Sequence, residues 1–254
     1  MKIVTMAAQK GGTGKSTTAH NIAAELAATR CRVLVVDMDP LAILTGNFGI
    51  TPEPGRDMAA VLGDEKPGTA ALTEIIMTAA DGIDIAPASL DLAYSDLAIT
   101  NRPGRENILK KALETVGDCY DFCIVDTPSG LGMLTLNSLA AADTVLIPIQ
   151  PTSNDIRGLQ AFLDTLQRMA PINPNLFIFG ILITRYDKRL RLHRQAMDEL
   201  TAAGLPVFPE VVTQSARIAE TSGQRQPLRE YDRRNPNNET YKAIAERLLK
   251  WQEN

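Results

Sequence analysis

The chain has 254 residues, a formal net charge of −4 and 44% hydrophobic residues, which is the balance of an ordinary globular protein. Its length suits one large domain or two small ones, and such a chain buries its own core without disulfide or metal staples. The acidic balance excludes a protein that coats nucleic acid with its whole surface, although it permits a local basic patch. Three cysteines without a CxxC pair favour a reducing compartment, and two histidines leave little room for a histidine-based metal site or a Ser-His-Asp hydrolase.

The N-terminal residues do not read as a targeting segment. The short apolar run of Met1–Ala8 is followed at once by Lys10 and a glycine loop, so there is no room for a signal-peptide core. No window of the sequence approaches the roughly 20 apolar residues that a membrane-spanning helix needs. We therefore expect a cytoplasmic protein.

Short apolar runs alternate with longer helical stretches along the chain. The runs predict buried strands at Lys2–Ala7, Arg32–Asp37, Ile83–Pro87, Phe122–Asp126, Thr144–Pro148 and Phe177–Thr184. Helices are predicted between and after them, at Lys15–Thr29, Arg105–Val116, Leu131–Ala141, Asp155–Arg168, Arg191–Ala203 and Asn237–Trp251. This alternation predicts an α/β fold with a doubly wound, mostly parallel sheet and helices on both faces. The Pro- and Gly-containing stretch Thr51–Gly68 is interpreted as a surface excursion, so residues 1–254 are expected to form a single domain.

A glycine-rich loop connects the first predicted strand to the first predicted helix. Strand, glycine loop and helix in this order make a phosphate-binding loop, because the glycines let several backbone N–H groups turn toward an oxyanion. Lys15 brings a full positive charge to the β- and γ-phosphates, and the Ser16 hydroxyl is placed to coordinate Mg²⁺. The predicted nucleotide-binding residues are Gly11, Gly12, Thr13, Gly14, Lys15, Ser16 and Thr17.

A second lysine, Lys10, precedes the double glycine, and Gln9 stands where the common GxxxxGK[ST] pattern has its first glycine. One interpretation is a solvated loop lysine. The other is that Lys10 neutralises nucleotide phosphate across a dimer interface, since its own loop already uses Lys15.

These residues resemble the deviant Walker A loop of the ParA/MinD family of P-loop ATPases. Two further segments agree with the family: VLVVDMDPL at Val33–Leu41 is similar to its Asp-x-Asp-Pro motif, and YDFCIVDTPSGLG at Tyr120–Gly132 is similar to its Walker B and switch segment. The resemblance continues at Leu134–Pro151, Ile181–Arg189, Ala216–Thr221 and Arg229–Asp232. It is greatest to the short chromosomal-type ParA partition proteins.

Three aspartates at predicted strand ends are the candidate acidic residues of the site. A carboxylate at the position of Asp126 can hold Mg²⁺ through its water shell. The resemblance implies that Asp39 positions or activates the attacking water, with Lys10 and Lys15 as the other catalytic groups, and that Asp37 supports the Mg²⁺ shell. The alternatives are a core aspartate for Asp126 and a cap or turn residue for Asp37 or Asp39.

The resemblance also indicates where the base of ATP lies and where this chain departs from its relatives. Thr184-Arg185 and the segment Pro209–Gln214, predicted to be a loop, occupy the places where the family holds adenine, although Arg185 can equally be a solvated strand-end residue. Leu41-Ala42-Ile43 replace the family's usual Gln-Gly-Asn, which can alter the hydrolysis rate. Arg157 stands where a Glu is often seen, so that helix departs from the family in the residues it offers to a dimer contact.

Basic residues concentrate toward the C-terminus. Residues 185–234 contain ten Lys/Arg and seven Asp/Glu, net +3, which leaves −7 for the rest of the chain. Arg189 and Arg217 match positions where ParA proteins place arginines on DNA phosphates; a solvated arginine-rich face is the alternative. Such contacts give affinity without sequence readout.

The resemblance implies an ATPase that binds ATP and Mg²⁺, forms a homodimer around two nucleotides and binds DNA nonspecifically. A ParB-like or cargo-adaptor partner would stimulate hydrolysis, so that DNA or another cargo is segregated or positioned on the nucleoid. The alternatives are a MinD-like ATPase on a membrane and a metabolic P-loop enzyme. The C-terminal helical face of Tyr241, Ile244, Leu248 and Trp251 is expected to dock on the protein and not on a membrane.

Overall fold

The computed structural model describes residues 1–63 and 68–253, and within them one sheet has the order β3-β4-β2-β5-β1-β6-β7-β8. Neighbouring strands are parallel except for β3, which is antiparallel to β4. The fold class predicted from the sequence is confirmed. The strands are β1 (Lys2–Met6), β2 (Val33–Asp37), β3 (Met77–Ala80), β4 (Ile83–Ala86), β5 (Phe122–Asp126), β6 (Thr144–Ile149), β7 (Phe177–Tyr186) and β8 (Val207–Thr213).

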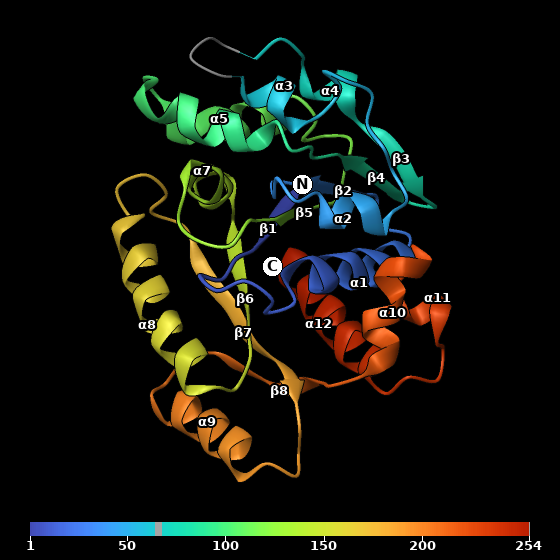
Figure 1. Cartoon of the computed structure of the whole chain (residues 1–254), viewed down its shortest axis with the longest axis vertical. Helices are drawn as coiled ribbons and strands as arrows, with labels where there is room; N and C mark the ends of the chain where they lie inside the picture. Colours follow the sequence, from blue (N-terminus) through green and yellow to red (C-terminus); the bar gives the residue numbers. More distant parts are fainter. Residues whose placement is uncertain (64–67, 254) are drawn as a thin grey trace.

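Helices cover both faces of the sheet (Figure 1). One face carries α1, α10, α11 and α12, and the other carries α3 to α9. The bounds are α1 (Lys15–Ala28), α2 (Ile43–Asn47), α3 (Met58–Leu62), α4 (Leu72–Ile75), α5 (Leu92–Ala98), α6 (Ile108–Glu114), α7 (Met133–Ala141), α8 (Ser153–Arg168), α9 (Arg191–Ala202), α10 (Ala216–Gln224), α11 (Leu228–Tyr231) and α12 (Asn237–Gln252).

The strands read as continuous apolar runs because both faces of the sheet are covered. In β2, Val33 and Val35 point to the α1 and α12 side, whereas Leu34 and Val36 point to the layer of α3, α4 and α6. Successive side chains of a strand point to opposite faces, so each strand must supply apolar residues to two cores.

The register of the central strands places the acidic residues together. Asp126, the last residue of β5, is paired with Met6 of β1 and with Asp37 of β2. The chain leaves β1 at this same edge to form the glycine loop. The topology alone therefore brings the loop and two carboxylates to the carboxyl ends of neighbouring parallel strands, where open α/β sheets bind their ligands.

The six predicted strands are all present, with bounds within two residues, but the prediction of a loop at Pro209–Gln214 is wrong. Pro209 lies inside β8, the edge strand beside β7. A proline removes a backbone donor, which an edge strand tolerates because one of its sides forms no ladder. The antiparallel edge strand β3 was not predicted from the sequence.

The prediction of a surface excursion at Thr51–Gly68 is only partly correct. Helix α3 lies within it, and Met58, Val61 and Leu62 are buried in the core beneath β2. Asp57 caps this helix, its carboxylate accepting a hydrogen bond from the backbone N–H of Ala60 at 3.1 Å. Residues 64–67 of the stretch lie outside the described residues.

Helix α12 docks on the protein, as predicted from its apolar face. Tyr241, Ile244 and Leu248 are buried against α1, and Trp251 packs edge-on against Phe177 of β7 at a ring distance of 5.7 Å. None of the described helices is long and apolar enough to cross a membrane.

Gly180 in β7 gives a test of the packing between the two last strands. A Cβ atom at Gly180 would overlap the ring of Phe208 on β8, so Gly180→Ala should lower the free energy of unfolding by about 1–3 kcal/mol. Gly223→Ala on α10 meets no atom within 4 Å and should leave stability unchanged or raise it by about 0.5–1 kcal/mol. Urea denaturation of both variants measures the difference, and equal midpoints would contradict this account of β7 and β8.

Candidate functional site

The loop between β1 and α1 is shaped as a cradle for an anion. Gly12 and Gly14 have φ of +76° and +94°, a left-handed conformation that glycine adopts without strain. Gly14 precedes α1, and the described structure shows neither a side-chain cap nor an acidic residue at this helix start. The first N–H groups of α1 are therefore free for a phosphate, which the helix dipole also favours.

Side chains from distant strands hold this loop in place. The Thr184 hydroxyl on β7 lies 2.8 Å from the carbonyl oxygen of Thr13, and the Gln150 amide donates to the carbonyl oxygen of Gly12 at 2.8 Å. The backbone N–H of Gly130 donates to the carbonyl oxygen of Gln9 at 3.1 Å. The sequence pointed to Thr184 as a neighbour of the base and gave no sign of Gln150. The support that both give to the loop depends on strand neighbours far away in the chain.

Lys15 is buried among the acidic residues of the site. Its side chain begins α1 and the residue is only 6% exposed. Burial lowers the pKa of the Lys15 ammonium, whereas the charges of Asp126 and Asp39 raise it. A buried cation facing two carboxylates, at the mouth of an anion cradle, is positioned to neutralise a phosphate chain.

Asp126 has unsatisfied oxygens in the part of the chain that the structure describes. The residue is fully buried, and neither carboxylate oxygen has a hydrogen-bond partner there. Burial, and then the charge of Asp37, raise the pKa of Asp126 well above its ordinary value, while the nearby Ser16 hydroxyl and Lys15 lower it. Orphaned buried carboxylates call for a cation, so Asp126 and Ser16 fit a Mg²⁺ ion that completes its shell with phosphate oxygens and water. The described residues contain no separate cluster of three or more metal-ligating side chains.

Asp37 is a buried anchor for the segment that follows it. One oxygen of its carboxylate accepts hydrogen bonds from the Thr45 backbone N–H at 2.8 Å and the Thr45 hydroxyl at 2.7 Å, and the other accepts from the Asp39 N–H at 3.0 Å. Burial raises the pKa of Asp37 to about 6, against the lowering effect of these hydrogen bonds. The Thr45 hydroxyl also accepts from the backbone N–H of Ala88 at 3.0 Å. Thr45 was not predicted from the sequence, and its hydrogen bonds connect β2, α2 and the segment after β4.

Asp39 lies at the turn between β2 and α2. It is 9% exposed, and its carboxylate accepts a hydrogen bond from the Leu41 N–H at 3.0 Å. Ala42 has a φ of +52°, a conformation that favours glycine. Leu41 and Ile43 are exposed on either side of it. The departure from Gln-Gly-Asn thus puts two apolar side chains and a strained alanine at the edge of the site.

Lys10 is engaged within its own chain. Its ammonium lies 2.8 Å from a carboxylate oxygen of Asp155 in the first turn of α8, and the Thr152 hydroxyl also contacts that oxygen. The Lys10 side chain is 48% exposed, but that of Asp155 is only 1% exposed. Asp155 therefore holds Lys10 beside the loop within a single chain. This partner of Lys10 was not predicted from the sequence.

A cavity of about 410 Å³ opens beside the loop. Thr184 and Arg185 at the end of β7 line it, as do Val212–Gln214, whereas Pro209 is not among the lining residues. Arg185 has a φ of +50°, and the pairing of β7 with β8 shifts register around it, between Ile183 and Tyr186. The remaining wall comes from the start of α1, from Tyr241 of α12 and from α10, an element absent from the sequence prediction.

Arg189 and Arg217 lie after the ends of neighbouring strands. The Gln214 N–H donates to the carbonyl oxygen of Tyr186 at 3.3 Å, which holds the end of β8 beside the end of β7. Arg189 follows the first strand and pairs with Asp187 at 2.8 Å; Arg217 follows the second and pairs with Glu220 at 3.0 Å. Both pairs are exposed, so a polyanion can displace the carboxylates at little free-energy cost.

We predict that Asp126→Asn stabilises the nucleotide-free chain and weakens Mg²⁺-dependent nucleotide binding. A carboxyl group whose pKa is raised by folding favours the folded state while it is protonated, and this contribution is lost as the pH rises. The ordinary pKa of an aspartate is 3.8 and that of Asp37 is about 6, so the free energy of unfolding should fall as the pH rises from about 4 to above 6. Asp126→Asn should raise it by about 1–3 kcal/mol at pH 7. Asp37→Asn, the matched control, should lower it because it disrupts the hydrogen bonds from Thr45 and Asp39. Denaturation with and without Mg-ATP tests both, and a destabilised Asp126→Asn chain would contradict the prediction.

The contact between Lys10 and Asp155 is expected to stabilise the single chain. Lys10→Ala leaves the Asp155 carboxylate buried without its cation and should lower the melting temperature. Asp155→Asn in the Lys10→Ala background removes that charge and should restore much of the loss. Calorimetry of the single and double variants is the measurement, and additive losses would argue against this pairing.

Comparison with known proteins agrees with this geometry. The model of a family described as "AAA domain" matches residues 1–178. The chain is 35% identical to the chromosome partitioning protein ParA of Myxococcus xanthus, covering 98% of this chain and 88% of that protein. It is 34% identical to the sporulation initiation inhibitor protein Soj of Bacillus subtilis, covering 97% of this chain and 98% of that one.

Solved structures have the same fold. A structure of cobyrinic acid a,c-diamide synthase from Mycobacterium smegmatis, with bound ATP analog and magnesium, superposes with a TM-score of 0.86 at 30% identity, covering 99% of this chain and 96% of that one. A plasmid partition protein from Borrelia burgdorferi gives a TM-score of 0.79 at 25% identity over 98% of each chain. The loop, the strand-end carboxylates and these relatives together show that the chain belongs to the ParA/MinD family of P-loop ATPases, the family its sequence resembles.

Proposed function

We propose that the chain, as a single ATPase domain over residues 1–254, is a ParA-type partition ATPase that binds ATP and Mg²⁺ and hydrolyses ATP slowly. The observation that carries the proposal is the buried Lys15 facing the unpaired carboxylate of Asp126 at the mouth of a glycine cradle. The names of its relatives, a chromosome partitioning protein and Soj, support partition as the purpose of the ATPase.

The proposed roles follow from where each group lies. The N–H groups of Gly11–Thr17 and the Lys15 ammonium hold the phosphates, while Ser16 and Asp126 hold Mg²⁺, which neutralises developing charge when bound. Asp37 keeps the segment carrying Asp39 in place, and Asp39 orients the attacking water. The cavity lined by Thr184, Arg185 and Val212–Gln214 takes the base, and Pro209 supports that wall only through β8.

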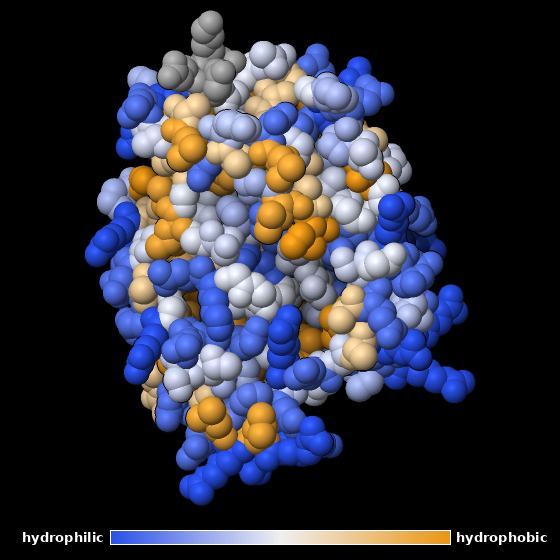
Figure 2. All heavy atoms as spheres, in the orientation of Figure 1, coloured by the Kyte–Doolittle hydropathy of each residue, from blue (hydrophilic) through white to orange (hydrophobic). Residues whose placement is uncertain are grey.

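We further propose a homodimer that encloses two nucleotides. Lys10 would exchange Asp155 for a phosphate of the facing subunit, which adds a cation where charge builds up. Apolar side chains gather over α5, α7 and the start of α2 on the same side of the molecule (Figure 2). Exposed apolar side chains within or next to α2 and α5 include Leu41, Ile43, Leu90 and Leu97. Such a patch on a globular surface supports an interface there.

DNA binding is assigned to Arg189 and Arg217. A single chain offers few phosphate contacts, so its binding is weak, and a dimer doubles the number of contacts and makes retention depend on ATP. We propose that a ParB-like or cargo-adaptor protein stimulates hydrolysis and releases the dimer, in the cytoplasm and on the nucleoid.

The membrane alternative is less well supported, since the apolar face of α12 is buried against α1. A metabolic role, as the name of one structural neighbour indicates for that protein, is tested by the effect of Lys10 on turnover.

The decisive experiment is DNA retention with ATP, with ADP, and with ATP for the Asp39→Ala variant. We expect ATP to raise both the dimer mass in light scattering and retention on DNA at low salt, ADP to do neither, and Asp39→Ala to stay bound because it hydrolyses ATP poorly. Arg189→Glu with Arg217→Glu should reduce retention about tenfold or more without changing dimer mass. If ATP changed neither mass nor retention, or if Lys10→Ala left turnover unchanged, the proposal would be wrong.

A further inference from the structure

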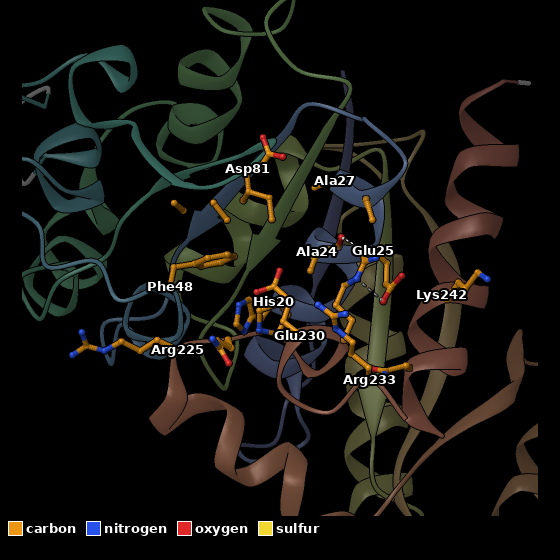
Figure 3. Close-up of a pocket in the computed structure, with 18 of the residues that line it drawn as sticks. His20, Ala24, Glu25, Ala27, Phe48, Asp81, Arg225, Glu230, Arg233 and Lys242 are labelled. Carbon is orange, nitrogen blue, oxygen red and sulfur yellow. Dashed lines mark hydrogen bonds and ion pairs between the residues drawn. The ribbon is translucent and has the colours of Figure 1, made fainter. Parts of the chain in front are cut away.

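One large cavity of the described structure does not belong to the nucleotide site. It has a volume of about 840 Å³ and lies behind α1, between the β3–β4 hairpin, the residue that follows α2, and the segment from the end of α10 into α12 (Figure 3). Neither the phosphate loop nor the three site aspartates line it. A ligand in this cavity would therefore not touch the phosphate loop or those aspartates.

The floor of this cavity is apolar and built from small or aromatic side chains. Ala24 and Ala27 of α1 and Ile83 of β4 form its flat part, and Phe48 and His20 form its aromatic part. The His20 ring meets the Phe48 ring edge-on at 4.4 Å. Burial lowers the pKa of His20 to about 4, so this imidazole is neutral at physiological pH. Such a floor accommodates an apolar side chain of a ligand.

The rim carries equal numbers of opposite charges. Its cations are Arg225, Arg229, Arg233 and Lys242. Its anions are Glu25, Asp81, Glu230 and Glu239. In Figure 3 the Arg233 and Glu230 side chains approach the middle of the cavity. Arg229 forms an ion pair with Glu25 at 3.7 Å. A phosphate-rich ligand would meet four carboxylates here, which opposes its binding, whereas a polypeptide with charges of both signs finds partners for each.

Helix α1 contributes to the walls of this cavity and of the cavity beside the phosphate loop. Phe48 directly follows α2, which the Asp37–Thr45 hydrogen bonds hold, and Asn47 accepts a hydrogen bond from the Ser222 hydroxyl of α10 at 2.6 Å. His20 lies on α1, the helix that starts at Lys15. Because α1 lines both cavities, and Arg225 of this cavity directly follows α10 of the other, a ligand in one can change the free energy of ligand binding in the other.

We propose that this cavity docks a polypeptide segment of a partner protein, whose apolar side chain lies on the floor between charged side chains of both signs. Docking is coupled to nucleotide binding through Phe48 and α1. Only the coupling rests on the proposed ATPase function; the docking itself does not. The volume accommodates several residues of a peptide and is far larger than a single amino acid requires.

The test uses the full chain and a random dodecapeptide library displayed on phage. Peptides enriched on the chain with an ATP analogue and Mg²⁺ are synthesised with a fluorescent label, and their Kd is measured by anisotropy. Enriched peptides should carry an apolar residue flanked by acidic and basic ones. Arg233→Glu at the rim and Ala28→Trp at the mouth should raise Kd about tenfold or more. Arg234→Glu is the matched control, an exposed neighbour that does not line the cavity, and should bind as the unaltered chain does.

Two results would overturn the docking: no enriched peptide, or peptides that bind the rim and mouth variants as tightly as the control. Equal peptide Kd values with the ATP analogue and with ADP would overturn the coupling, since linkage requires peptide and nucleotide to change each other's affinity by one factor. These readouts involve neither hydrolysis nor DNA. A chain that docks peptides but fails to hydrolyse ATP would refute the proposed function alone.

Discussion

The arrangement of this molecule depends on placing like charges at the same buried edge of the sheet. The register of β2 and β5 pairs Asp37 with Asp126, and both are fully buried. Burial raises the pKa of both carboxyl groups, and the charge of Asp37 raises the pKa of Asp126 further. The chain relieves one of them with hydrogen bonds from Thr45 and Asp39 and leaves the other next to Lys15. Asp126 is therefore the carboxylate that a bound cation would stabilise, so cation binding and protein stability are coupled at this residue.

Hydrogen bonds extend from this edge into elements that lie far apart in the chain. Asp37 holds Thr45, Thr45 holds the backbone of Ala88, and Asn47 on the same short helix contacts Ser222. Helix α2 has only five residues and is not stable by itself, so these contacts determine where it lies. A change in the ligand near Asp39 can thus reach α10 and the cavity behind α1 without a large rearrangement of the sheet.

The parts of the molecule that were predictable from sequence are those with local causes. The run from β1 through the glycines to Lys15 is contiguous, and Asp126 ends a strand whose apolar run is unmistakable, so both could be placed before the fold was known. Asp155 is 145 residues from Lys10, and Thr184 is 171 residues from Thr13, so neither contact has a local signal. Pro209 was misleading because a proline disfavours a strand in general but is tolerated at the edge that β8 occupies. Short helices such as α2 and α3 were missed since tertiary contacts form them.

The hydrogen bond between Gln214 and Tyr186 has a consequence for how this protein can evolve. It joins the end of β7, which precedes Arg189, to the end of β8, which precedes α10 and Arg217, and residues at both strand ends line the cavity proposed for the base. If Arg189 and Arg217 bind a polyanion as proposed, a substitution that moves either strand end also shifts the walls of that cavity. Selection could then not adjust one property and leave the other unchanged, so sequence variation at these two strand ends should be correlated among related chains.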